Sequence, residues 1–371
     1  MTVDPRRDHS FVIPDPWQTV DNDAPNACIS CHQNNNNQWA AAAMKNWGLD
    51  QKQNAWVKIN QGLEQQDVLV FRDYARNPPP KTLSPIRQAT LLSKLAGFPS
   101  RLAVETASAQ LTNPDPLIRR AAVSALAGLP VDLRWQLLNP LIDDPVKSIR
   151  LEVASRLADA LLQIQGQNAE RLGALIDEYR KSLAFNADSP AGQLALGILE
   201  QQLGYSILAE RAYLRALEIE PGFVPALINL SDLYRTLGSD GEAKERLELA
   251  LEVAPDSATA NHAYGLYLVR AGQAEMALQY LQAAVQQQDT SPRHVYVYAV
   301  ALDSRGQTAA AMELIESEIQ RWTNNLDLYF LQVAYMDKTG STDGIHRYLS
   351  TLATVAANNP QVRNWMSKYG K

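Results

Sequence analysis

The chain has 371 residues, of which 46% are hydrophobic and 20% are charged, so it is long enough for several domains or a repeat array and too apolar for wholesale disorder. The formal net charge of −6 and the pI near 5.5 exclude a general electrostatic attraction to nucleic acid or to anionic lipid. No apolar run in the sequence approaches the roughly 20 residues of a membrane-spanning helix.

The first 38 residues contain four prolines and end in a run of asparagines, a composition that cannot hold a long helix. We therefore expect an extended N-terminal arm that ends in a loop. Cys28, Cys31 and His32 form the motif C-x-x-C-H in this loop, and the motif contains both cysteines of the chain. Two thiols at this spacing can bond to the two vinyl groups of one porphyrin, and the adjoining His can ligate its iron. The motif predicts one covalently attached haem c in this chain.

Other uses of the two cysteines fit the sequence less well. A structural zinc site needs four Cys or His ligands, and no second pair with suitable spacing exists. A redox dithiol usually lies in a βαβ context, and the sequence shows no strand pattern. The motif does not specify which residue is the second axial ligand of the iron. His9 on the arm is the first candidate, for this haem or for one bound upstream, and Met44 is the weaker alternative; His9 as a plain surface residue is the third possibility.

Two helices are expected after the motif. The first covers 38–47 and is stopped by Gly48, and the second covers about 51–73, before a run of three prolines. Four tryptophans of this region predict either an aromatic lining for the haem or a small helical core. They are Trp17, Trp39, Trp47 and Trp56.

Segments 4–11, 25–32 and 38–40 resemble the end of the cytochrome part in bacterial multihaem c-type cytochromes that are fused to tetratricopeptide repeats. The resemblance is close over these segments and looser over the rest of the chain. It implies that further haem motifs lie upstream in a longer exported protein. The chain begins without an export signal, so we expect an N-terminally truncated sequence whose haem-loaded form is periplasmic or otherwise exported.

Short helices at near-regular spacing are predicted over 84–165. Similar segments begin at Ile86, Ile118 and Ile149, which are 32 and 31 residues apart. Asp115-Pro116 and Asp144-Pro145 precede the last two, where an Asp can cap a helix and a Pro fits its first turn. This pattern resembles short HEAT repeats, which are antiparallel helix pairs stacked into a solenoid. The seams between the repeats are expected to be filled by Val123, Leu126, Val153 and Leu157.

Five glycines then recur at intervals of 34 residues, the tetratricopeptide period: Gly204, Gly238, Gly272, Gly306 and Gly340. Small residues recur in the same register at Ala209, Ala243, Ala277, Ala311, Ala216, Ala250 and Ala284. Each Gly would form the turn inside a helix pair, and the alanines let the two helices approach closely. Pro221 and Pro255 would end the second helices. The register predicts five tetratricopeptide repeats over 190–359, among them 224–257.

The expected fold class is therefore all-α. A small haem-binding segment with its arm covers 1–80, HEAT-like repeats cover 84–165, connecting helices cover 166–189, and a cap or tail at 360–371 follows the tetratricopeptide solenoid. The concave groove of this solenoid, where partner peptides commonly bind, is expected to be lined by Arg235, His262, Arg270, Arg293 and Tyr296.

The leading functional hypothesis is electron transfer by a c-type haem, with the solenoid docking it to a redox partner or subunit. One alternative is a non-redox protein–protein interaction scaffold whose C-x-x-C-H motif stays unloaded. A further alternative is the tail of a multihaem oxidoreductase whose catalytic haem lies upstream. The sequence contains no Ser-His-Asp order, paired carboxylates or phosphate-binding loop, so a carrier or scaffold is favoured over an enzyme.

Overall fold

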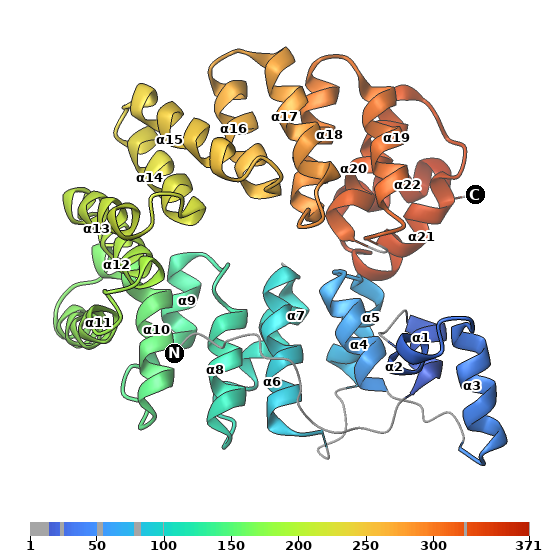
Figure 1. Cartoon of the computed structure of the whole chain (residues 1–371), viewed down its shortest axis with the longest axis horizontal. Helices are drawn as coiled ribbons and strands as arrows, with labels where there is room; N and C mark the ends of the chain where they lie inside the picture. The colour runs from blue at the N-terminus through green and yellow to red at the C-terminus, as the bar shows by residue number, and fades with distance from the viewer. Residues whose placement is uncertain are drawn as a thin grey trace.

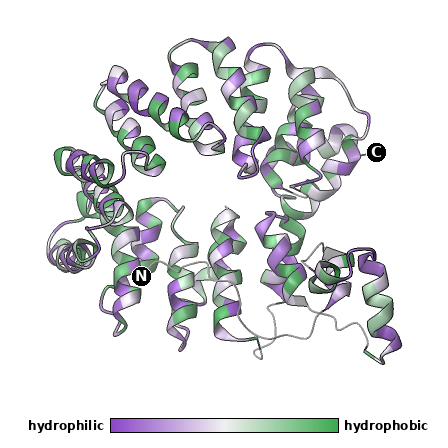
Figure 2. Cartoon of the chain, in the orientation of Figure 1, coloured by the Kyte–Doolittle hydropathy of each residue, from purple (hydrophilic) through white to green (hydrophobic). Residues whose placement is uncertain are grey.

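The computed structural model describes residues 15–22, 26–49, 55–77, 83–98, 100–322 and 325–370. Within these ranges the chain is built from α-helices and short 3-10 helices, without a strand. Successive helices lie side by side along a curved path that brings the last ones back beside the first (Figure 1). Hydrophobic and hydrophilic residues alternate around the helices, as expected where each helix packs against neighbours (Figure 2). The expected fold class, an all-α helical-repeat solenoid, is confirmed.

The N-terminal part is helical where an extended arm was expected. Its three short helices are α1 (Pro16–Asn22), α2 (Ala27–Cys31) and α3 (Asn37–Asn46). Pro16 stands in the first turn of α1, where its missing N–H costs nothing. Asn26 and Asn36 cap α2 and α3 with side-chain oxygens that accept hydrogen bonds from the first turns. The arm prediction is therefore wrong for the described residues of this part, while His9 lies outside them.

The first helix after the motif is confirmed, and the second is not one helix. It consists of α4 (Ala55–Glu64) and α5 (Val68–Arg76). The break lies at Gln66, whose φ of 56° is left-handed, and at Asp67, whose carboxylate accepts hydrogen bonds from the N–H groups of Leu69 and Val70 in the first turn of α5. A glycine usually marks such a break, and here a glutamine occupies the position.

The HEAT-like region consists of helices and short 3-10 turns. They are α6 (Pro85–Ser93), η1 (Lys94–Gly97), α7 (Arg101–Ser108), α8 (Pro116–Ala125), α9 (Val131–Leu138), η2 (Asn139–Leu141), α10 (Lys147–Leu157) and η3 (Ala158–Leu162). The four expected seam residues are at most 1% exposed. Asp115 caps α8 as expected. Asp144 does not cap α10, which begins three residues later; it instead binds Arg119 of the preceding repeat, with 3.0 Å between the carboxylate and Nε.

The connecting helix α11 (Gln167–Ala184) leads into five helix pairs and a final helix. These are α12 (Pro190–Gln202), α13 (Ser206–Ile219), α14 (Val224–Thr236), α15 (Asp240–Val253), α16 (Ala258–Arg270), α17 (Ala274–Gln286), α18 (Pro292–Ser304), α19 (Thr308–Glu318), α20 (Leu326–Thr339), α21 (Ile345–Val355) and α22 (Pro360–Tyr369). The five periodic glycines have φ between 72° and 78°, and the seven register alanines are at most 1% exposed. Pro221 and Pro255 each come two residues after a second helix ends.

The last helix closes the far end of the solenoid. Trp365 of α22 is 1% exposed, and its indole N–H donates to a carboxylate oxygen of Asp337 over 3.1 Å. This end also returns toward the beginning of the structure, because α21 contacts α5 (Figure 1). Val355 packs against the first hydrophobic core, the cluster of buried residues that runs from Leu63 of α4 to Leu203 at the end of α12. The solenoid is thus closed into a ring. No helix in the described part of the chain is long and apolar enough to cross a membrane.

Candidate functional site

The C-x-x-C-H motif lies on one turn of helix rather than in a loop. Cys28 and Cys31 are in α2, and His32 is its C-cap, with its backbone N–H donating to the Cys28 carbonyl over 2.9 Å. Cys31 and His32 follow Cys28 by three and four positions, so each of them lies near the helix face of Cys28. Cys28 is half-buried, Cys31 and His32 are exposed, and neither cysteine is in a disulfide. The three side chains are therefore accessible together.

Helix α3 holds the motif in place from one side. The side-chain amide of Asn26 donates to the Asn37 side-chain oxygen over 3.1 Å, which links the start of α2 to the start of α3. The His32 ring lies against the Trp39 indole, with centroids 4.9 Å apart and planes tilted by 51°. Trp39 is 38% exposed and Trp47 is 75% exposed, so neither forms a core, whereas Trp56 packs against the first hydrophobic core.

Met44 lies on the packed side of α3. It is 5% exposed, and its position is about 140° around the helix from Trp39, which contacts the motif. Helix α1 packs against α3 as well. The structure therefore places Met44 in the packing of the N-terminal segment.

The residues present at the motif fit a c-type haem by their chemistry. Two free thiols on one helix face match the two thioether bonds of the cofactor, and the adjoining imidazole matches its proximal iron bond. Among the described residues, no group of three or more His, Cys, Asp or Glu side chains is placed to hold a bare metal ion.

The concave side of the tetratricopeptide solenoid is its second candidate site. The first helices of successive pairs contact each other, as α12 does with α14 and α14 with α16, so they line the inner side of the curve. Arg293 and Tyr296 of α18 are exposed, and so is Arg270 at the end of α16. Arg235 of α14 is half-buried and bound to Asp232, with 2.6 Å between Nη2 and the carboxylate.

His262 does not line the groove as an open side chain. It is 8% exposed on α16, and its ring packs against that of His294 on α18, with centroids 4.8 Å apart. The Nδ1 atom of His262 is buried without a hydrogen-bond partner in the described structure. Burial, His294 and Arg293 lower the pKa of His262 to about 4. The two histidines are therefore a neutral, buried pair under the groove.

Electrostatics and apolar exposure define the groove further. Partial burial lowers the pKa of the Arg270 guanidinium; the neighbouring Arg235 lowers it further, and Asp232 and Asp240 oppose this. Neither Arg270 nor Arg293 makes an ion pair with another described residue. Val269 is 47% exposed and Val300 is 40% exposed beside these arginines. Both valines were missed in the sequence, although Val300 follows Tyr296 by one helical turn and so shares its face.

An open groove of about 700 Å³ lies elsewhere, along α12 and α13. Its apolar part includes Ile207, which is 74% exposed, and Leu214, which is 38% exposed. Charged residues of both signs, including Arg211 and Glu218, flank them. No periodic signal in the sequence marks this surface, because its apolar residues lie outside the glycine and alanine positions that recur every 34 residues.

The helix pairs, buried alanines and left-handed glycines together define a helical-repeat solenoid of the tetratricopeptide type. Residues 224–257 match the family model described as Tetratricopeptide repeat, and these are the bounds expected for one repeat. The tetratricopeptide part of the sequence resemblance is thereby confirmed, whereas its cytochrome part stays a prediction.

Several solved structures have a similar fold. The crystal structure of MamA is 22% identical, covers 45% of this chain and 97% of its own, and has a TM-score of 0.38. PilW, a type IV pilus biogenesis factor, is 19% identical, with 58% of this chain and 98% of its own covered and a TM-score of 0.42. A tetratricopeptide repeat protein from Parabacteroides merdae is 14% identical, with coverages of 72% and 97% and a TM-score of 0.39. A comparison with curated proteins finds no match.

Proposed function

We propose that the chain is a protein-interaction scaffold that binds an acidic, partly apolar segment of a partner on the concave side of α14, α16 and α18. The observation that supports this most is the exposure of Arg270 and Arg293 beside Tyr296 and Val300. Aromatic residues and arginine are enriched at protein interfaces, and unpaired guanidinium groups select carboxylates. Tetratricopeptide solenoids present such concave surfaces to extended or helical peptides.

The test measures binding of labelled peptides that alternate Glu with Leu, and of Lys–Leu counterparts, by fluorescence anisotropy. The Glu–Leu peptides are expected to bind more tightly, and the double variant Arg270→Glu/Arg293→Glu is expected to weaken them at least tenfold. Arg363→Glu changes an exposed arginine on α22 and is the matched control. Equal affinity for both peptide charges, or equal loss in the control, would refute the proposal.

A second function is supported by a separate observation, the accessible side of α2. In this proposal Cys28 and Cys31 hold a haem c by thioether bonds and His32 ligates its iron, while Trp39 fixes the orientation of the imidazole. The haem would supply one-electron exchange with a protein redox partner. Asn26 keeps the motif oriented by capping α2 and by its hydrogen bond to α3.

This second proposal is tested by exporting the chain into a periplasm that contains the haem attachment machinery. The purified protein is expected to keep its haem after denaturation, and Cys28→Ala/Cys31→Ala is expected to abolish attachment while the circular dichroism stays helical. A colourless wild-type protein with two titratable thiols would contradict the proposal and leave the scaffold function alone. Nothing in the described residues favours the further alternative, the tail of a multihaem oxidoreductase.

A further inference from the structure

The two ends of the solenoid meet at a small interface of their own. One side is formed by the α4–α5 turn, α5 and the segment around Phe98, and the other by the start of α20 and the end of α21 (Figure 1). Arg72 of α5 donates from Nη1 to the Thr354 carbonyl over 3.2 Å, at the C-terminal end of α21. That end of a helix carries partial negative charge, so a guanidinium is favourable there.

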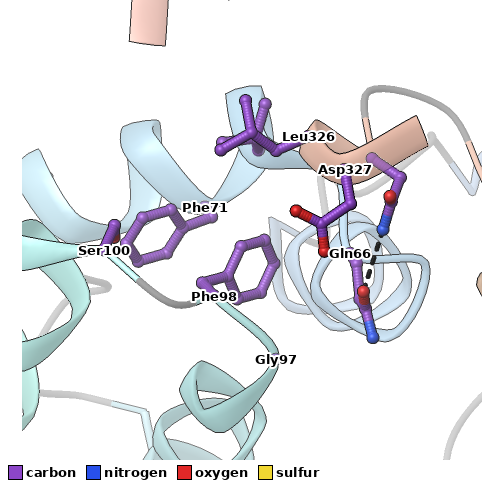
Figure 3. Close-up of a pocket in the computed structure, with 9 residues that line it drawn as sticks. Gln66, Phe71, Gly97, Phe98, Ser100, Leu326 and Asp327 are labelled. Carbon is purple, nitrogen blue, oxygen red and sulfur yellow. Dashed lines mark hydrogen bonds between the residues drawn. The ribbon is translucent and has the colours of Figure 1, made fainter. Parts of the chain in front are cut away.

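The interface also encloses a cavity of about 30 Å³ (Figure 3). Phe71 and Phe98 stack on one side of it, with ring centroids 4.5 Å apart, and Leu326 and Asp327 lie on the other side. A space of this size holds about one water molecule. Within the solenoid, the four expected seam residues of the HEAT-like region and the seven register alanines are at most 1% exposed. The meeting of the ends therefore combines a small cavity with polar side chains, those of Gln66, Asn325 and Asp327.

Gln66 joins the two ends at a conformational cost. Among the described residues it is the only non-glycine residue with positive φ. Its N–H donates to Leu63 and the next N–H donates to Gly62, which is the hydrogen-bond pattern that usually ends a helix with glycine. The side chain lies over Gly97, and its Oε1 accepts a hydrogen bond from Asn325 Nδ2 over 2.9 Å. A side chain is thus kept at a position where glycine would relieve the backbone.

The N-cap hydrogen bond that Asn325 makes with α20 orients its side chain for this contact. Asn325 is 3% exposed, and its side-chain oxygen accepts the Leu328 N–H over 3.1 Å as the N-cap of α20. The cap fixes the amide, so its NH₂ group points to Gln66. Gln66 and Asn325 are 259 residues apart in the chain, and this hydrogen bond connects its two ends.

We propose that Gln66 and Asn325 form the centre of a latch that holds the solenoid as a closed ring and that opens without unfolding the repeats. Opening separates α5 from α21 and gives a partner access to the inner side from the edge. The strained backbone at Gln66 supports this, since strain persists where a side chain has a specific task. The Arg72 contact adds a charge-dependent component that salt weakens. The latch does not depend on which partner the groove binds.

The test uses the full chain and two variants that each remove the latch but keep local structure. Gln66→Gly suits the left-handed backbone and lacks the acceptor, and Asn325→Ser keeps an N-cap for α20 but is too short to reach Gln66. Both are expected to increase amide hydrogen exchange in α5 and α21 about five- to tenfold, as for loss of one part-buried hydrogen bond. Both are also expected to raise the radius of gyration in small-angle X-ray scattering. The double variant should show no more opening than either single one.

Arg76→Gln is the control, because it changes an exposed side chain of α5 and leaves Gln66, Asn325 and Arg72 in place. It is expected to stay closed, with wild-type exchange and scattering. The latch is overturned if Gln66→Gly and Asn325→Ser leave exchange in α5 and α21 and the scattering curve unchanged. It is also overturned if the wild-type chain already scatters as an open solenoid.

Discussion

Lowering the pH from 7.5 to 4.5 is expected to loosen the seam between α16 and α18, where His262 and His294 pack ring to ring. Both are 8% exposed, and Nδ1 of His262 has no partner among the described residues. Burial, His294 and Arg293 lower the pKa of His262 to about 4, and burial also lowers the pKa of His294 in spite of nearby Asp289. Protonation therefore has to place a charge in a site that disfavours it.

The sign of the effect follows from the depressed pKa of His262. The unfolded segment has an ordinary histidine pKa of about 6.5 and so binds more protons than the folded one between this value and about 4. The stability is fully present above pH 6.5 and is lost as the pH falls toward 4. A shift of this size corresponds to about 3 kcal/mol at most. In a repeat protein the loss is local, because each repeat contacts mainly its neighbours.

The assay is hydrogen exchange of α16 and α18 at pH 7.5, 6.0, 5.0 and 4.5, corrected for the intrinsic pH dependence of exchange. His262→Asn removes the titrating ring and is expected to flatten the pH dependence in these two helices. His346→Asn changes an exposed histidine of α21 and is the control, because carboxylates elsewhere also titrate near pH 4.5. A pH dependence that is the same in His262→Asn as in the wild type would refute the reasoning.

Three further predictions concern the stability of the solenoid. Gly238→Ala meets no atom within 4 Å, so only its left-handed φ of 78° is strained, and we expect a loss of about 1 kcal/mol in the urea unfolding of the repeats. Arg119→Ala leaves the Asp144 carboxylate, whose side chain is 4% exposed, without its ion partner, and should cost about 3 kcal/mol and speed exchange in α8 and α10. Trp365→Phe removes the indole hydrogen bond to Asp337 and should lower the stability of the C-terminal repeat by about 2 kcal/mol in calorimetry.

The repeated parts of the fold were predictable because their signals are short-range and recur. Gly204 and its four periodic counterparts each form the same left-handed turn, and the alanines in register are all buried. A period repeated several times needs no knowledge of distant contacts. The break at Gln66 was missed, because the usual signal for such a turn is glycine and the reason for glutamine lies at Asn325, at the other end of the chain.

The same difference between local signals and distant contacts applies to the candidate sites. Cys28, Cys31 and His32 lie within one helical turn and its C-cap, where a loop was expected, and the haem that their spacing predicts stays a prediction. The extended arm was a wrong expectation because proline was read as a helix breaker, while Pro16 occupies the first turn of α1. The burial of His262 was not predictable from its position within one repeat, because the ring that covers it belongs to His294 of the next.

The closed ring connects the two proposed functions. Helix α2, which carries the motif, contacts α3, α3 contacts α1, and α1 contacts α4. The latch at Gln66 and α5 follow α4 directly in the chain. The helices of the groove, α14, α16 and α18, are connected with the same latch through α20, which contacts α18 and begins beside Asn325. While the latch is closed, two series of helix contacts connect the motif with the groove, one across the latch and one through the repeats. Together they hold the motif and the groove in one fixed arrangement. Opening the latch leaves only the longer series through the repeats, so a partner bound in the groove would then be positioned less rigidly relative to the motif.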